Sequence, residues 1–234
     1  MFNLNLKLAV INMPELEIYI ITILALSFTL AYAFGSRYNY KIQKKIWKKI
    51  SNEIKPYSKK VAFKSLGSSG FKIACKSKRG PLAKLEVSIV LLSREIPLYY
   101  LISKYAGKHD AIVIKSNFKS APEFTLEIVR RGTKFHSKLV EKTNYTELHH
   151  KKLSEHFFLA SSKPNRASEF LSNGNILQSL LKLSNKIERL SITNEEPHLL
   201  LSCPMEEDII HQLFSLASAC GKVLESLKMT GNRG

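Results

Sequence analysis

The chain has 234 residues, enough for one sizeable domain beside a membrane anchor. Its apolar fraction of 44% is sufficient for an ordinary hydrophobic core, which argues against a wholly disordered protein. The charge is unbalanced, because 36 Lys and Arg oppose 19 Asp and Glu and leave a net charge of +17. Such an excess indicates anionic partners, of which lipid headgroups and nucleic acid are the two common kinds.

Residues 16–36 predict a single transmembrane helix. The uncharged run from Ile18 to Phe34 covers about 25 Å as a helix, and extension to Ser36 gives a full span with tyrosines near both ends. A cleaved signal peptide is the main alternative, since Ala31-Tyr32-Ala33 has the form of a cleavage site. Signal peptides, however, carry positive charge before the apolar run. A buried core helix of a soluble protein is the third interpretation.

The charges flanking this span are asymmetric. Residues 1–15 carry one lysine, whereas nine basic residues follow the span and only Glu53 opposes them: Arg37, Lys41, Lys44, Lys45, Lys48, Lys49, Lys55, Lys59 and Lys60. Positively charged flanks stay in the cytoplasm. We therefore expect a cell-membrane protein with a short extracytoplasmic tail at 1–15 and a cytoplasmic C-terminal domain, with either Met1 or Met13 as the start.

Residues 37–58 predict a basic amphipathic helix ending near Pro56. Isoleucines recur every four residues from Ile42 to Ile54, and lysines occupy the other faces. Two interpretations stay open: a helix that lies on an anionic membrane surface, or a flank whose isoleucines pack on the soluble domain. The first makes anionic lipid headgroups the partner, and its contact residues are Arg37, Lys41, Lys44, Lys45, Trp47, Lys48 and Lys49.

Residues 59–228 predict a mixed α+β domain with mostly antiparallel strands and a C-terminal helix. A hairpin over 59–78 turns at Gly67-Ser68-Ser69-Gly70, and a helix from Pro97 to Tyr105 stops at Gly107. Further strands are expected at 83–92, 111–118, 124–131, 155–162, 186–193 and 198–204, and helices at 164–170, 175–185 and 206–227. Residues 132–154 are interpreted as a weakly structured connection, and 229–234 as a flexible tail.

The sequence contains no motif typical of an enzyme active site or a phosphate-binding loop. The glycine-rich turn lacks the Gly-Lys-Ser/Thr ending of a phosphate loop, and no nucleophile motif or carboxylate pair is present. Cys75, Cys203 and Cys220 are widely spaced, so buried thiols are expected. His149, His150 and His156 cluster, but no Cys or acid lies at a zinc-site spacing from them, so solvated histidines are expected. We expect no enzyme activity, no catalytic or metal site, no cofactor and no small-molecule ligand.

A resemblance adds to this interpretation. The segments Leu66–Phe71, Leu91–Glu95 and Leu98–Ser103 resemble a group of uncharacterised archaeal membrane proteins with one N-terminal span and a cytoplasmic α+β domain. The resemblance covers the anchor and residues 60–130. It implies an archaeal source and no known activity.

The positive charge is concentrated in the first part of the domain. Residues 61–152 hold 18 Lys and Arg against 7 Asp and Glu, while residues 153–234 hold 8 against 9. The leading hypothesis is a membrane-tethered, non-enzymatic domain that binds the anionic membrane surface or a protein partner. The alternative is a membrane-tethered nucleic-acid or ribosome binder, which the same basic half would suit.

Overall fold

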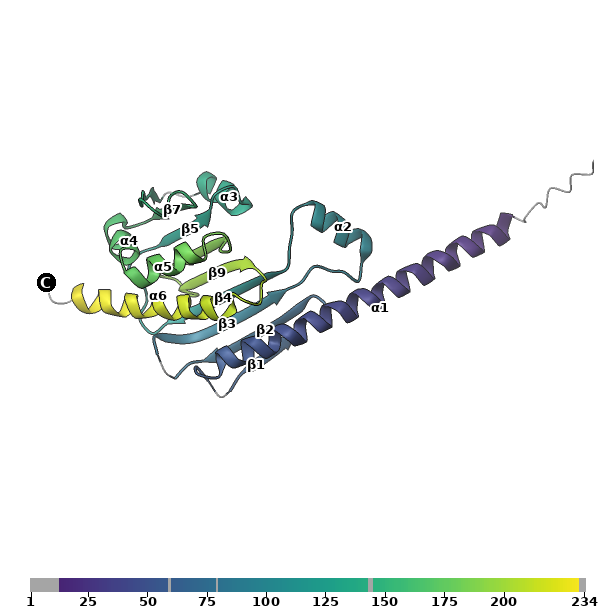
Figure 1. The fold of residues 1–234 in the computed structure, drawn as a ribbon, viewed down its shortest axis with the longest axis horizontal. Helices are drawn as coiled ribbons and strands as arrows, with labels where there is room; N and C mark the ends of the chain where they lie inside the picture. Colours follow the sequence, from purple (N-terminus) through teal and green to yellow (C-terminus); the bar gives the residue numbers. More distant parts are fainter. Residues whose placement is uncertain (1–12, 59, 79, 143–144, 232–234) are drawn as a thin grey trace, which may run out of the picture.

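One long helix, α1 (Met13–Ile54), leads into a nine-stranded sheet with helices on its face (Figure 1). The computed structural model describes residues 13–58, 60–78, 80–142 and 145–231. At 1.5 Å per residue, the 42 residues of α1 extend about 63 Å. This single helix contains both the predicted span at 16–36 and most of the predicted basic helix at 37–58. The predicted tail at 1–15 lies outside the described residues except for the first turn of α1.

All strand pairs in the sheet are antiparallel, in the order β1-β2-β3-β4-β9-β8-β5-β7-β6. The α+β prediction is confirmed, as is the hairpin turn at Gly67–Gly70, where Gly67 has φ of +65°. The strands are β1 (Ala62–Ser65), β2 (Gly70–Lys76), β3 (Leu82–Val90), β4 (Ala111–Phe118), β5 (Leu126–Arg130), β6 (Thr146–Glu147), β7 (Phe157–Ser161), β8 (Arg189–Ile192) and β9 (Leu199–Pro204).

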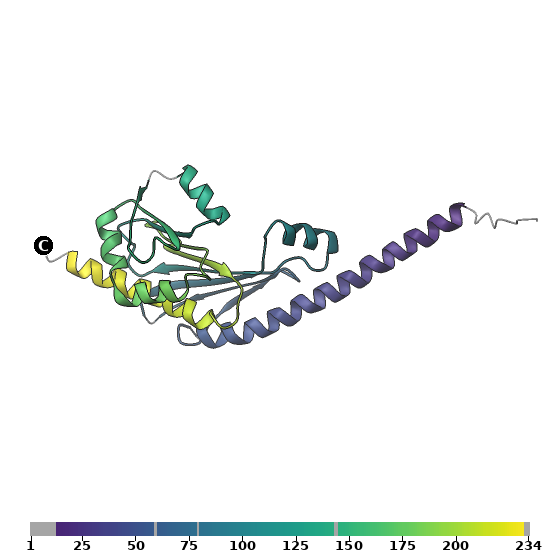
Figure 2. The same cartoon turned by 45° about the horizontal axis from the view of Figure 1, so that its top comes forward.

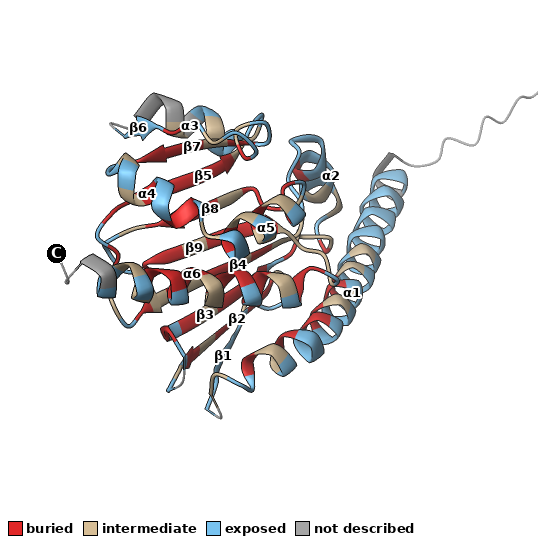
Figure 3. Ribbon diagram, turned by 60° about the vertical axis from the view of Figure 1, so that its left-hand side comes forward, coloured by how far each residue is buried: buried red, intermediate tan, exposed pale blue. Residues whose placement is uncertain are grey.

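The helices α4, α5 and α6 and the C-terminal half of α1 lie on one face of the sheet (Figure 3). Helix α2 instead projects beyond the sheet toward α1 (Figure 1). The remaining helix bounds are α2 (Pro97–Tyr105), α3 (Lys134–Lys142), α4 (Pro164–Leu171), α5 (Gly174–Lys182) and α6 (Ile210–Gly231).

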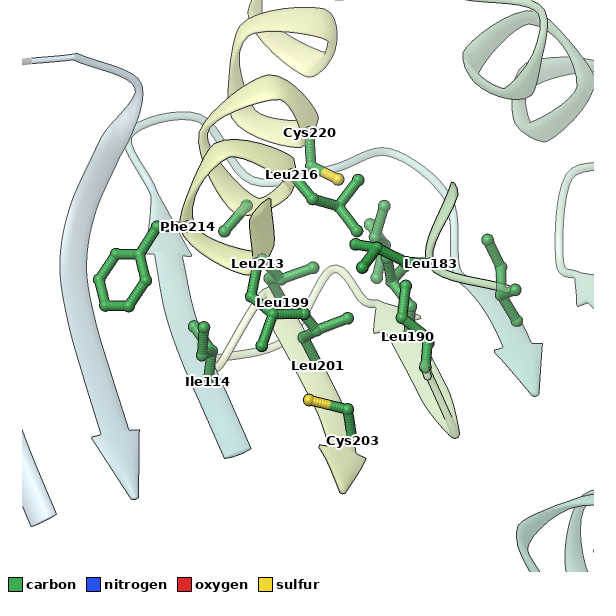
Figure 4. Close-up of a cluster of buried hydrophobic side chains, with 14 of the residues drawn as sticks. Ile114, Leu183, Leu190, Leu199, Leu201, Cys203, Leu213, Phe214, Leu216 and Cys220 are labelled. Atoms are coloured by element: carbon green, nitrogen blue, oxygen red, sulfur yellow. The ribbon is translucent and has the colours of Figure 1, made fainter. Parts of the chain in front are cut away.

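The core lies between this helical layer and the sheet. Alternate residues of β2 and β4 point into it, as Phe71, Ile73 and Cys75 do in β2. Figure 4 shows its centre, where Leu213 and Leu216 of α6 lie over β4, β9 and β8. The predicted C-terminal helix buries one apolar stripe, formed by Leu213, Leu216, Ala217, Cys220 and Leu224.

Two predictions about local structure are wrong. Residues 132–154 are not merely a connection, since they contain α3 and the short strand β6, which pairs with β7. The last helix begins at Ile210 and not at residue 206, so the acidic residues 206–208 precede it, and Glu207 there pairs with Lys45 of α1. Within the predicted tail at 229–234, residues 229–231 belong to α6 and 232–234 lie outside the described residues.

Candidate membrane-proximal site

The N-terminal half of α1 is an exposed apolar helix. It is the one described helix long and apolar enough to cross a membrane, and almost none of its apolar window is buried inside the protein. Large side chains stand in the open along it, including Ile21 at 65% and Phe34 at 66% exposure. A core helix would bury such residues, so the interpretation as a buried core helix is wrong.

The C-terminal half of α1 belongs to the domain. Ile46, Ile50 and Ile54 are at most 2% exposed and join the same hydrophobic core as the sheet. Spaced four residues apart, they form one stripe along the helix, which packs against β2 and α6. Of the two interpretations left open by the sequence, packing on the domain therefore accounts for the isoleucines, and they are not available to a membrane surface.

The basic residues of α1 divide into two groups. Lys45 and Lys49 both pair with Glu207, at 2.6 and 3.1 Å, and so attach the helix to the segment before α6. These ammonium groups, Lys45 foremost, hold the pKa of Glu207 below its usual range. Arg37, Lys41, Lys44 and Lys48 are exposed and make no ion pair within the described part of the chain.

Trp47 is a packing residue as well as a surface residue. Its ring meets Phe63 edge-on at 5.2 Å and Phe71 at 6.0 Å between centroids, while 37% of the residue stays exposed. This cluster joins α1 to β1 and β2. The structure thus brings the predicted contact residues onto one helix but gives Trp47, Lys45 and Lys49 partners inside the protein.

A polar junction fastens α1 to the loop between β3 and α2. Asn39 is fully buried and donates from Nδ2 to the carbonyl of Leu92 at 2.8 Å. Its Oδ1 accepts from Arg94, which also forms a bidentate pair with Asp110 at 2.7 and 3.0 Å. The Arg94–Asp110 pair is therefore structural, and the part played by Asn39 has no signal in the sequence.

The same junction depends on a glycine. A Cβ atom at Gly35 would collide with the backbone carbonyl of Arg94, so α1 and the loop are in direct backbone contact there. About two turns further along α1, Gln43 donates to the carbonyls of Gly67 and Ser68 in the β1–β2 turn. The end of the apolar run in α1 is therefore fixed against the domain at several points.

The face of the sheet away from the helices is basic over β1 to β4. Lys64 lies opposite Lys72, and Lys76 lies opposite Lys84. Lys115 of β4 shares this face, where it lies opposite Glu86 of β3, so the repulsion concerns the two lysine pairs. Like charges placed directly across a strand pair destabilise a sheet. An anionic partner on this face would relieve that repulsion.

The described residues also contain a cavity and three thiols that bear on possible chemistry. A cavity of about 870 Å³ is lined by lysines with Pro56, Tyr57, Val61 and Cys75, and none of its lining residues within the described ranges is a carboxylate or an imidazole. The three thiols are buried and free, and burial raises their pKa, that of Cys220 to about 12. Within the described ranges no cluster of His, Cys, Asp or Glu is arranged to hold a metal ion.

Comparisons with known proteins leave the function to be argued from this geometry. No protein-family model matches the sequence, and no curated protein matches it either.

Proposed function

We propose that this is a single-pass membrane protein whose basic C-terminal domain is held at the cytoplasmic surface of an anionic membrane. The observation that carries the proposal is the continuity of α1, whose apolar half is exposed and whose other half is built into the domain core. The helix passes without a break through Ala31–Ala33, the candidate cleavage site. Cleavage there would cut a continuous helix three turns before the buried stripe begins, which favours a retained anchor.

The geometry ranks the candidate lipid contacts by distance. If the hydrocarbon core ends near Ser36, Lys41 lies about 6 Å and Lys48 about 17 Å beyond Arg37 along the helix. The headgroup layer is about 5–8 Å thick on each side of a bilayer. Arg37 and Lys41 then lie among the headgroups, while Lys48 lies beyond them and beyond the screening length of about 8–10 Å.

Spin-labelled lipids test this proposal on the full chain in mixed vesicles. We expect phosphatidylglycerol to associate more than phosphatidylcholine, and the double variant Arg37→Gln, Lys41→Gln to lose that preference by up to about fivefold per charge. The single variants Lys41→Gln and Lys48→Gln form a matched pair, with the same charge change at two positions along the helix, and only the first should weaken the preference. Equal association of both lipids with the unmodified chain would count against the proposal.

The orientation is tested separately. Protease added to inverted vesicles is expected to digest the C-terminal domain, whereas the domain in right-side-out vesicles stays intact. The opposite pattern would place the basic half outside and contradict the positive-inside assignment.

A second candidate, nucleic-acid binding, is favoured by the cross-strand lysine pairs on the open sheet face. Lys64, Lys72, Lys76 and Lys84 would neutralise phosphates, although β1 to β4 place no aromatic ring on this face for base stacking. RNA binding by the detergent-solubilised chain should then fall steeply with salt and be lost in Lys72→Glu, Lys84→Glu. Binding that survives this double variant would remove the sheet face as the RNA site.

A further inference from the structure

Helix α2 presents its apolar side to solvent. Leu98, Leu101, Ile102 and Tyr105 have the i, i+3, i+4, i+7 spacing of one helix face, and they are 67%, 61%, 58% and 98% exposed. The residue that α2 buries is the small, polar Ser103, which is 2% exposed. A surface helix of a soluble domain has the reverse arrangement. The stripe therefore has no partner among the described residues.

The position of α2 indicates what that partner is. The loop before it contacts α1 at Gly35 and Asn39, directly after the uncharged run that ends at Phe34. From this contact α2 projects away from the sheet beside α1, and Figures 1 and 2 agree on this placement. A membrane crossed by α1 up to Ser36 would thus have its surface at the level of α2.

The residues around the stripe have the composition of a membrane interface. The ammonium groups of Lys104 and Lys108 lie over the rings of Tyr100 and Tyr99, at 5.9 and 5.7 Å from the centroids. Residues 96–108 contain two lysines and no acid. Tyrosine and lysine side chains beside an apolar helix face are typical of helices that lie in the headgroup region.

We propose that α2 is a second membrane-contacting element, which inserts Leu98, Leu101, Ile102 and Tyr105 into the same leaflet that α1 enters. This proposal rests on the proposed membrane anchoring and deepens it, because it assigns the lipid contact to a helix far along the chain from the span. A lipid surface, and not a protein, is the occupant, because the loop before α2 is held against α1 at Gly35 and Asn39, directly after the exposed apolar run that ends at Phe34.

The helix is also held in place for this contact. The side chain of Lys134, the first residue of α3, donates to the carbonyl of Ala106 at 2.8 Å, just after α2 ends. At the other end, the Arg94–Asp110 pair closes the excursion from β3 to β4. Both ends of α2 are therefore tied to the domain, so its apolar side keeps a fixed direction relative to α1.

The test places an environment-sensitive fluorophore on a single introduced cysteine in the full chain, reconstituted in vesicles of phosphatidylcholine and phosphatidylglycerol. The native cysteines are buried and stay unlabelled. Leu101→Cys reports on α2, Ile23→Cys on the span, and Lys222→Cys is the control in the C-terminal half of α6, which points away from the apolar half of α1 in Figure 1. Trp47 fluorescence during thermal melting checks that each labelled variant is folded.

We expect the label at Leu101 to shift to shorter emission wavelengths, to be quenched by nitroxides on the lipid chains and to be protected from iodide. The label at Lys222 should show the opposite quenching. If the Leu101 label is quenched by iodide as strongly as the Lys222 label, the proposal for α2 is overturned. Quenching of the Ile23 label by lipid nitroxides in the same preparation shows that anchoring itself holds. If lipid nitroxides do not quench the Ile23 label, the proposed membrane anchoring has failed as well.

Discussion

The C-terminal half of α1 is part of the domain core, and truncating one of its buried isoleucines tests this. Ile50 is fully buried between α1 and the domain, and an Ile→Ala change at such a site costs about 2–5 kcal/mol of unfolding free energy. For a domain of this size, each kcal/mol lowers the melting temperature by about 2–4 °C. Ile50→Ala should therefore lower the melting temperature by about 4–20 °C.

The single tryptophan provides the assay, because Trp47 contacts Phe63 across the same helix–sheet boundary. Its fluorescence should change when α1 leaves the domain during melting in detergent. Ile23→Ala is the matched control, since it removes the same atoms from a side chain that is 63% exposed in the apolar half. Equal melting temperatures for the two variants would refute the claim that α1 is part of the domain core.

Three further predictions concern the contacts around this helix. Gly35→Ala should destabilise the domain by about 1–3 kcal/mol, through collision with the loop before α2, whereas Gly174→Ala, which meets no atom within 4 Å, should be neutral or slightly stabilising in the same melt. The ion pairs of Glu207 stabilise the protein above the unfolded glutamate pKa of about 4.3 and are lost as the pH falls through its lowered folded pKa. Acid melting below about pH 4 should therefore be less steep in Glu207→Gln, and an unchanged pH dependence would exclude this pair as a contributor. Cys220, whose pKa burial raises to about 12, should react with iodoacetamide at pH 8 no faster than the domain unfolds, and fast labelling of the native protein would contradict its burial.

Elements with strong local signals could be predicted from the sequence. Helix α2 begins at Pro97 and is followed by Gly107 at φ of +71°, so both ends were marked by residues with restricted or special backbone conformations. The turn at Gly67–Gly70 was similarly marked. In α1, periodic isoleucines predicted a helix but left open whether it would pack on the domain or lie on a membrane.

Features that depend on distant partners could not be predicted. Strand β4 pairs with β9, about 90 residues later, and no local pattern specifies that neighbour. The interval 132–154 looked unstructured because α3 is polar and β6 has two residues. Asn39 gave no hint of its role, since its hydrogen bonds go to Leu92 and Arg94, more than 50 residues away.

The spacing of α2 illustrates the same limit in the functional region. A stripe such as Leu98, Leu101, Ile102 and Tyr105 predicts a helix, and in most domains it also predicts the face that packs inward. Here the fold turns that face outward, because Ser103 contacts the domain instead. The sequence therefore predicts the helix but not what surrounds it. That depends on the contact between the loop before α2 and Gly35 of α1.

The rigidity of this arrangement has a consequence for the membrane. A flexible linker between span and domain would let the domain adopt many orientations, whereas α1 is one unbroken helix from the apolar run to Ile54. Because the helix is unbroken, the tilt of the apolar half of α1 then determines the orientation of the domain. Contact of α2 with the leaflet would restrict this tilt further. Loss of the α2 contact should therefore broaden the distribution of domain orientations without releasing the protein from the membrane.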